Sequence, residues 1–397
     1  MERVARCSTA RQALTSPTRR TRCFSTTMQA QKAALKRQQS IPASYYRGGT
    51  SRGIMLRRED LPSDQSQWDS IFLGCIGSPD PYMRQLDGMG GGISSLSKVC
   101  VLPDVDYTFV SLGVDNSQVD YSSNCGNMLS AVGPYAIDTG ITSVERGARD
   151  GDEVTVRIHN TNTDKIIHSS FAVVVEGEVA EAAAGGDLAI DGVSGLASPI
   201  RLQFMKPAGS RTGKLLPTGS ATDTFGGFTV TCIDVANPCV FVSASQLGVP
   251  CNLTPQQIDD HPTLKSTLES IRRMAAVKMG LAPSEDQTPG SVPKIAIVAP
   301  PADPSRSNIE VRAMSVGQPH KAIPITVALA IAAAAKLQGT TVFECAARGD
   351  SDKFATVIHH ASGVLGVDGK FSNPGELESA TVLRTARRLM EGRVFWK

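Results

Sequence analysis

The stretch from Ala322 to Ala335 is the feature that most constrains how this 397-residue chain can fold. Its 14 residues lie between Lys321 and Lys336 and include no charged side chain. A segment of this length is too short to cross a bilayer. A helix that is apolar on every side must also be covered on every side. We therefore expect a helix buried in a protein core, with a sheet wrapped around it.

A second apolar segment, Met128 to Ile137, follows the small polar run Tyr121-Ser-Ser-Asn-Cys-Gly-Asn127. Small polar residues before an apolar run predict a helix start, with the N-cap at Ser122, Ser123 or Asn124. A helix N-terminus leaves backbone N–H groups free and carries the positive end of the helix dipole. This elbow is therefore a candidate site for a carboxylate or a phosphate.

Two residues of this elbow could take part in ligand binding or in chemistry. Gly126 lets a ligand approach the backbone closely, and Cys125 places a thiol beside it. Helix N-termini favour the thiolate form of cysteine, so Cys125 is a candidate reactive group. On the local sequence alone, a buried structural cysteine fits equally well.

The second half of the chain repeats this plan. Met314 to His320 is a small-residue elbow that opens the apolar helix, which we expect to run to about Leu337. A strand, an elbow and a buried helix in each half predict an α+β pseudo-dimer of two similar domains, each a sheet around a central helix. Two helix N-termini facing one interdomain cleft would form an anion site. After this helix, Thr341 to Cys345 is predicted as a strand.

Two domains separated by a linker are expected. The N-terminal domain is predicted to span 41–213 together with about 384–397, and the C-terminal domain 225–383. Glycine, proline, serine and threonine dominate 209–227, which is the expected linker.

Residues 1–39 differ from the rest of the chain. They hold nine lysines and arginines and one acid, whereas the remaining residues hold 31 basic and 37 acidic side chains. A leader rich in arginine, serine and threonine is typical of a cleavable mitochondrial transit peptide, and the cut is expected after Phe24. This predicts import into the mitochondrial matrix, and initiation at Met28 would give a cytosolic form. The alternative is a basic extension with no targeting role.

Several function classes are disfavoured by the remaining residues. The body is acidic overall, so it lacks the basic footprint of a nucleic-acid-binding protein. The nine scattered cysteines form no C-x-x-C pair, which disfavours a disulfide framework or a zinc site. The glycine-rich segment Asp87 to Lys98 suits backbone contact with a ligand. It does not match the G-x-x-x-x-G-K-[ST] spacing of a nucleotide-binding P-loop.

A series of short motifs, in order along residues 41–397, resembles the 2-methylaconitate isomerase (PrpF) family. They are Arg47 to Gly53, Gly77 to Tyr82, Gln85 to Gly91, Ser94 to Lys98, Asn124 to Asn127, Ala131 to Pro134, Leu215 to Gly219, Arg312 to Ser315 and Leu389 to Gly392. The family also includes enzymes that act on methylitaconate, aconitate and 4-oxalomesaconate. Membership implies the diaminopimelate-epimerase fold, with the active site in the interdomain cleft.

The resemblance implies a cofactor-independent isomerase that moves a C=C bond in an unsaturated di- or tricarboxylic acid. Neither a metal nor an organic cofactor is expected. Lys98 and Cys125 match the family positions for proton transfer, and the sequence leaves open which is the base and which the acid. A lysine base must be neutral near pH 7, so Lys98 is alternatively a charge partner for a substrate carboxylate. The expected substrate-binding residues are Thr50, Ser51, Asn124, Gly126, Asn127, Ser315, Gly317, His320, Ser362 and Gly363.

Three departures from the family pattern concern the expected cleft and therefore the substrate. They are Arg52, the segment Pro319 to Lys321, and the segment Asp234 to Cys239. Besides the substrate, a homodimer and a functional link to an aconitase or methylcitrate-cycle enzyme are expected, and neither nucleic acid nor a membrane is. Two alternatives stay open, namely a proline- or amino-acid-type racemase or epimerase, and a non-enzymatic carboxylate-binding accessory protein of an aconitase-like enzyme.

Overall fold

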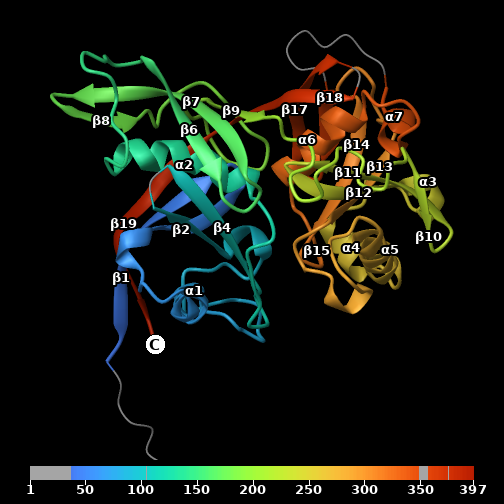
Figure 1. The fold of residues 1–397 in the computed structure, drawn as a ribbon, viewed down its shortest axis with the longest axis horizontal. Coiled ribbons are helices and arrows are strands. Elements are labelled where there is room, and N and C mark those ends of the chain that lie inside the picture. The colour runs from blue at the N-terminus through green and yellow to red at the C-terminus, as the bar shows by residue number, and fades with distance from the viewer. Residues whose placement is uncertain (1–36, 104, 348–355, 374) are drawn as a thin grey trace, which may run out of the picture. The chain divides into compact units, whose positions relative to one another are not determined.

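The structure is a computed structural model that describes residues 37–103, 105–347, 356–373 and 375–397 (Figure 1). Nearly all of the predicted leader, including the expected cleavage site and Met28, lies outside the described residues. The first strand begins at Gln39. Among the described residues, no helix has the length and apolar character that crossing a membrane would require.

The first half of the chain contributes nine strands and two α-helices to the described structure. The helices are α1 (Trp68–Ile76) and α2 (Gly126–Asp138). The strands are β1 (Gln39–Gly48), β2 (Ser51–Arg57), β3 (Lys98–Leu102), β4 (Asp106–Leu112), β5 (Val119–Asp120), β6 (Glu153–Asn160), β7 (Lys165–Glu176), β8 (Val179–Ala182) and β9 (Ile200–Met205).

The second half adds the remaining described elements. Its helices are α3 (Ala244–Leu247), α4 (Pro255–Asp260), α5 (Leu264–Lys278), α6 (Ile325–Ala334) and α7 (Thr341–Cys345). Its strands are β10 (Asp223–Phe225), β11 (Phe228–Val235), β12 (Asn237–Ser243), β13 (Lys294–Ala299), β14 (Ile309–Ser315), β15 (Gln318–Pro319), β16 (Thr356–His360), β17 (Gly363–Asn373), β18 (Glu376–Arg384) and β19 (Ala386–Trp396).

Strands pair in the same pattern in each half. In the first half β2 is parallel to β3, β3 is antiparallel to β4, and β4 is parallel to β6. In the second half β12 is parallel to β13, β13 is antiparallel to β14, and β14 is parallel to β16. In each half a short strand also pairs antiparallel with the third strand of this pattern: β5 pairs with β4, and β15 pairs with β14. The doubled α+β plan predicted from the sequence is therefore confirmed.

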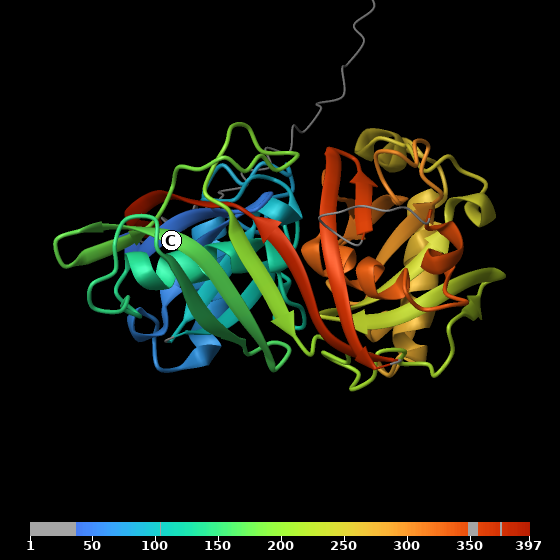
Figure 2. The same cartoon turned by 90° about the horizontal axis from the view of Figure 1, so that it is seen from above.

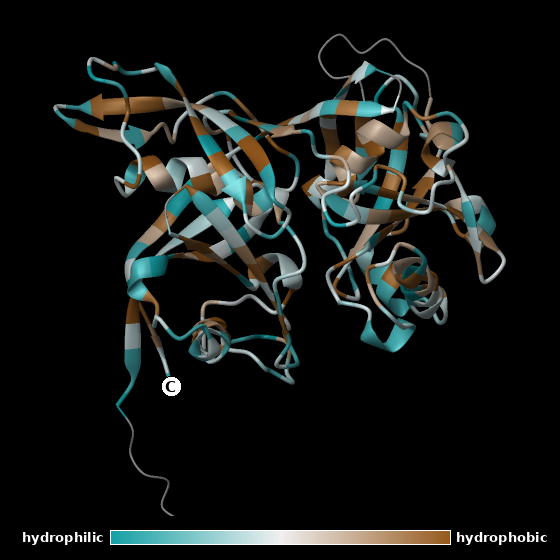
Figure 3. Ribbon diagram, viewed as in Figure 1, coloured by the Kyte–Doolittle hydropathy of each residue, from teal (hydrophilic) through white to brown (hydrophobic). Residues whose placement is uncertain are grey.

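A buried helix lies at the centre of each half. All residues of α6 are buried, and so are all residues of α2 except Asp138 (Figure 1). Figure 3 shows apolar residues along α6, whereas α5 mixes polar and apolar residues because one of its faces meets water. The two central helices share one large core with the strands around them. An all-apolar helix is stable here because the sheet encloses it.

One antiparallel ladder joins the two halves into a continuous sheet. Strand β18 of the second half pairs with β9 of the first, from Arg384 opposite Ile200 to Ser379 opposite Met205 (Figure 2). The chain then returns to the first half through β19, which pairs with β1. The sheet continues through this ladder, so it does not mark where one domain ends and the next begins. The boundaries predicted at 213, 225 and 383 therefore stay a prediction.

The prediction of a strand at Thr341 to Cys345 is wrong, since these residues form helix α7. The Oγ1 atom of Thr340 accepts a hydrogen bond from the backbone N–H of Phe343 at 3.1 Å. Such an N-cap stabilises the first turn of a helix and outweighs the strand preference of Thr341, Val342 and Phe343.

The predicted linker is attached to the second half through Asp234, whose side chain is fully buried at the end of β11. Its carboxylate accepts hydrogen bonds from the backbone N–H groups of Arg211 and Thr212 at 2.8 and 2.9 Å. The hydroxyl groups of Ser210 and Thr212 donate to the same carboxylate. Asp234, expected to line the cleft, is therefore an anchor for the loop at 209–213.

We expect Asp234→Ala to lower the free energy of unfolding by about 3 kcal/mol, because it leaves several buried donors without an acceptor. Denaturant unfolding of the full chain measures this change. Asp187→Ala is the control, since Asp187 is exposed, and it should change stability by less than about 0.5 kcal/mol. Equal stability of both variants would contradict the anchoring role.

Candidate functional site

A cavity lies where the N-termini of the two central helices meet. Its lining combines residues from both halves of the chain: Ser51, Lys98, Phe109, Ser111, Ser123, Asn124, Cys125, Gly126, Asn127, Lys294, Ser315, Val316, His320, Pro324, Ile325 and Thr326. Two amines, a thiol and an imidazole therefore face one small space. No aspartate or glutamate is among these lining residues.

The structure brings most of the sequence-predicted site residues to this cavity and leaves some outside. Those that line it are Ser51, Lys98, Asn124, Cys125, Gly126, Asn127, Ser315 and His320. Thr50 lies just behind the lining, where its backbone N–H donates to Asn127 Oδ1 at 3.4 Å. Gly317 lines a neighbouring cavity instead. Ser362 donates to the backbone oxygen of Lys321, and Gly363 packs against Asp191, so neither reaches the lining.

Helix α2 begins one residue later than the sequence predicted. Its N-cap is Cys125, and no side chain accepts a hydrogen bond at this helix start. Of the predicted cap residues, Ser122 donates to Asp120, and the backbone of Asn124 pairs with Asn237 while its side chain has no hydrogen-bond partner among the described residues. The first-turn N–H groups of α2 are therefore available to an anion beside the Cys125 thiol.

Helix α6 also begins later than predicted. The elbow at Met314 to His320 forms the end of β14 and the short strand β15, and α6 starts only at Ile325, with Pro324 as N-cap and no side-chain cap. Proline cannot donate a backbone hydrogen bond, and its fixed φ suits the residue that precedes a helix. Two uncapped helix N-termini thus face the same cavity.

Asn237 joins these two helix starts. Its Oδ1 accepts from the backbone N–H of Asn124 at 3.0 Å, and its Nδ2 donates to the backbone oxygen of Asn124 at 2.7 Å and to Thr326 Oγ1 at 3.3 Å. One buried side chain of β12 therefore positions the Cys125 elbow against α6. Asn237 lies in the segment Asp234 to Cys239, which departs from the family pattern, but the sequence alone does not indicate this role.

Lys98 and Lys294 are the cations of the site. Lys98 is the first residue of β3, is 8% exposed, and holds its Nζ 4.9 Å from the centre of the Phe109 ring. An aromatic face attracts an ammonium group at this distance. Lys294 is the first residue of β13 and is 7% exposed. Lys294 was not among the residues predicted from the sequence, although its place at the start of a buried strand, like that of Lys98, was a usable signal.

His320 contributes a neutral donor. Its Nδ1 accepts a hydrogen bond from the backbone N–H of Ala322 at 3.0 Å, so the ring proton is on Nε2. Burial, together with the charges of Lys98 and Lys294, lowers the pKa of His320 to about 3. The imidazole is therefore uncharged at neutral pH and can donate from Nε2.

Several buried polar atoms at or beside the cavity have no hydrogen-bond partner among the described residues. They are Thr50 Oγ1, Ser51 Oγ, Asn124 Oδ1 and Nδ2, and Arg384 Nε. Buried polar atoms in folded proteins are nearly always paired. A polar ligand in the cavity would supply partners for those that line it.

Arg384 supports the cavity from behind. Its Nη2 donates to Asn127 Oδ1 at 3.2 Å, and burial lowers its pKa to about 10, so it stays charged at neutral pH. Because Oδ1 also receives the Thr50 N–H, the amide of Asn127 is fixed with Nδ2 as its remaining donor. Gly49 has a φ of +48°, and a Cβ there would collide with Asn127 and Arg384. The turn between β1 and β2, at Gly49, therefore packs directly on the start of α2.

The described residues include no group of three or more His, Cys, Asp or Glu side chains arranged to hold a metal ion. All seven cysteines of the described chain are free thiols. Cys125 is the one that lines the cavity, whereas burial raises the pKa of Cys239, in β12 of the second half, well above its usual range.

Comparisons with known proteins match nearly the whole described chain. The family model described as "PrpF protein" matches residues 38–397. A 3-methylitaconate isomerase from Eubacterium barkeri is 37% identical over 385 residues, covering 90% of this chain and 97% of that protein. A (4E)-oxalomesaconate Delta-isomerase from Novosphingobium is 38% identical, and a 2-methyl-aconitate isomerase from Shewanella oneidensis is 37% identical. They cover 90% and 89% of this chain, and 97% and 96% of their own length.

Solved structures agree with this assignment. A methylitaconate-delta-isomerase superposes with a TM-score of 0.70 at 35% identity, covering 91% of this chain and 96% of that one. A hydroxyproline epimerase from Agrobacterium vitis has a TM-score of 0.51 at 11% identity, covering 91% of this chain and 94% of its own, and shows the fold alone. The predicted diaminopimelate-epimerase-like fold is confirmed.

The predicted mitochondrial location is contradicted by the comparisons. The named relatives are bacterial enzymes, and bacteria have no mitochondria. The match to the family model begins at residue 38, after the basic leader, and no comparison shows a transit peptide.

The family match covers the entire described body of the chain, and its relatives are named isomerases or tautomerases at 34–38% identity. The racemase and accessory-protein alternatives are not favoured by these relatives. The resemblance predicted from short motifs is thus confirmed, and the chain is an isomerase that belongs to the PrpF family.

Proposed function

We propose that this isomerase moves a C=C bond in an unsaturated di- or tricarboxylic acid by allylic proton transfer, using Lys98 and Cys125. The observation that carries the proposal is the composition of the cavity. An amine, a thiol and two uncapped helix N-termini converge there, and none of the lining residues is acidic. Such a space favours an anion with more than one carboxylate.

The substrate class is supported by the relatives. They are named for 3-methylitaconate, 2-methylaconitate and oxalomesaconate, all of which are unsaturated acids with several carboxylates. Within that class, Asn127 and the serines of the cavity contribute neutral donors suited to carboxylate oxygens. A homodimer and a functional link to an aconitase-like enzyme remain predictions from the sequence.

The chemistry needs one proton removed from an allylic carbon and one proton returned to the far carbon of the allylic system. When the C–H bond breaks, its electron pair spreads over the C=C bond and the adjacent carboxylate as a dienolate. Protonation at the other end moves the double bond and completes the balance. Fixed donors around the carboxylate stabilise the dienolate, and here they are the helix N-termini and His320 Nε2.

The geometry favours one division of roles. A helix N-terminus favours thiolate, and Cys125 is the N-cap of α2. The Phe109 ring attracts an ammonium group at Lys98. We therefore assign proton removal to the Cys125 thiolate and proton return to the Lys98 ammonium. After one turnover the thiol and the amine exchange their protons with water and recover the starting state.

Proton NMR in D₂O tests the reaction itself. Methylitaconate, 2-methylaconitate, cis-aconitate and trans-aconitate are supplied separately to the full chain. We expect deuterium to enter an allylic carbon of at least one acid together with a shifted double bond. A folded protein that promotes no exchange in any of these acids would contradict the proposed function.

Variants of the two residues test their roles. Lys98→Ala and Cys125→Ser should each lower kcat by about 10²- to 10⁴-fold, because each removes one proton-transfer group. Lys278→Ala is the control, since this lysine is exposed at the end of α5. Melting temperatures of all three variants should stay near that of the wild type.

Deuterium exchange in these variants separates base from acid. Lys98→Ala should still exchange the allylic proton of its substrate without moving the double bond, because Cys125 can remove a proton and return it to the same carbon. Cys125→Ser should lose both exchange and isomerisation. The reverse pattern would make Lys98 the base.

A further inference from the structure

Lys294 is the structural counterpart of Lys98 in the second half of the chain. Lys98 opens β3, which is parallel to β2 and antiparallel to β4. Lys294 opens β13, which is parallel to β12 and antiparallel to β14. The internal repeat therefore places one lysine from each half at the same point of the strand pattern.

The residues opposite these lysines are also equivalent. Lys98 lies opposite Ser111 in the β3–β4 ladder. In the β13–β14 ladder Ile295 lies opposite Met314, so Lys294 comes opposite Ser315 as that ladder is continued by one residue. All four residues line the cavity. The site thus has a lysine and a serine on each side, related by the repeat.

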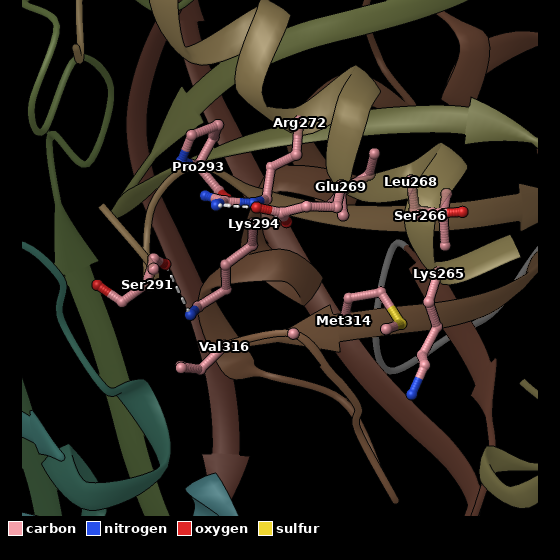
Figure 4. A pocket seen from close by; sticks show the side chains of 13 residues that line it. Lys265, Ser266, Leu268, Glu269, Arg272, Ser291, Pro293, Lys294, Met314 and Val316 are labelled. Atoms are coloured by element: carbon pink, nitrogen blue, oxygen red, sulfur yellow. Dashed lines mark hydrogen bonds and ion pairs between the residues drawn. The ribbon is translucent and has the colours of Figure 1, made fainter. Parts of the chain in front are cut away.

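Lys294 has no counter-ion among the described residues. Its Nζ donates to the backbone oxygen of Ser291 at 3.1 Å, and no carboxylate oxygen lies within 4.0 Å. Figure 4 shows its side chain extending toward Ser291 and away from the ion pair formed by Arg272 and Glu269. A buried ammonium without a counter-ion is costly, and the cost is offset once an anion binds beside it.

None of the charged and titratable groups around Lys294 takes the position of its counter-ion, so that position is open to a ligand. Those that act on it are Lys98, Cys125, Cys239 and Asp120, and His320 is a further neighbour. Asp120 is already engaged, since its carboxylate accepts from the backbone N–H groups of Ser122 and Ser291 at 2.7 and 3.1 Å. Burial and the nearby Lys98 lower the pKa of Lys294 to about 8.

Lys265, a second lysine nearby, differs from Lys294 in its exposure and in having a counter-ion. Lys294 also lines a neighbouring cavity of about 250 Å³, and Lys265 lies on the lining of that cavity as well (Figure 4). Lys265, however, is half-exposed and pairs with Asp259 at 2.7 Å. Of these two lysines only Lys294 lines the catalytic cavity, so Lys265 provides a matched control.

We propose that Lys294 binds a substrate carboxylate on the second-half side of the cavity and so selects acids with more than one carboxylate. This inference rests on the proposed function. Lys98 and Cys125 act at the reacting carbons, and Lys294 holds a carboxylate that stays unchanged during the reaction. The donor set predicts that substrates lacking this carboxylate bind weakly even when their C=C system is intact.

Calorimetric titration with propane-1,2,3-tricarboxylate tests the proposal without turnover, because this acid has no C=C bond. The wild type should bind it, and Lys294→Met should weaken binding by about 100-fold. Lys265→Met should bind within about twofold of the wild type. Thermal melting checks the fold, and we expect Lys294→Met to melt no lower than the wild type because it removes a buried unpaired charge.

The pH dependence gives a second readout. Lys294 binds an anion in its protonated form, so wild-type affinity should fall by about tenfold for each pH unit above about 8. In Lys294→Met this loss of affinity should be absent. In turnover assays the variant should raise KM far more than it lowers kcat, since the interaction is made in the ground state as well.

Two results would overturn the inference, and they are distinguishable. If the wild type and Lys294→Met bind the tricarboxylate equally well, Lys294 does not hold a carboxylate, while the isomerase function stands. If the folded wild type fails to bind the tricarboxylate at all, the polycarboxylate class proposed as substrate fails, and this inference fails with it.

Discussion

The contact between the two central helix N-termini is the constraint on which the rest of the site depends. Gly126, the first residue of α2, lies so close to α6 that a Cβ there would be 2.7 Å from Cβ of Ile325. Two positive helix ends would repel each other in isolation, but here Asn237 ties them together through Asn124 and Thr326. The packing of the two halves therefore creates a positive cavity that neither half could form alone.

The positive potential is not neutralised by the protein. The cavity lining contains two lysines and no carboxylate, and side chains such as that of Asn124 keep unpartnered polar atoms there. These features are unfavourable in the empty protein and become favourable when a polyanion binds. The site thus destabilises the folded protein, and burial of the large apolar core shared by α2, α6 and their sheets offsets this cost.

The turn between β1 and β2, at Gly48 and Gly49, is rigidly supported against the start of α2. Asn127 is fixed from behind by Arg384 and by the Thr50 N–H. A side chain at Gly48 would collide with the backbone oxygen of Asn127 at 2.5 Å. The loop after β1, the start of α2 and the end of β18 therefore form one unit. Residues far apart in the sequence thus hold the side-chain amide of Asn127 in one orientation. Fixed orientation matters because it determines how well a donor stabilises developing charge.

Much of the architecture was determined by the sequence alone. The apolar stretches at 128–137 and 322–335 can be stable only inside a core, and this forces the doubled plan of a sheet around a helix. The short motifs identified the family, and Lys98 and Cys125 could be named because they lie within those motifs. Helix ends were less predictable, since the start of α2 depends on tertiary contacts such as the pairing of the Asn124 backbone with Asn237.

Only the tertiary structure decided which residues from the second half complete the cavity. Lys294, like Lys98, stands at the start of a buried strand, but its role comes from the β13–β14 register and from the lack of a carboxylate oxygen within 4.0 Å of its Nζ among the described residues. Asn237 and Arg384 act across more than 100 residues of chain, whereas Ser362 and Gly363, which looked suitable, fall outside the lining. Local patterns report the periodicity of single elements, but the partners of a buried polar group are set by how those elements pack together.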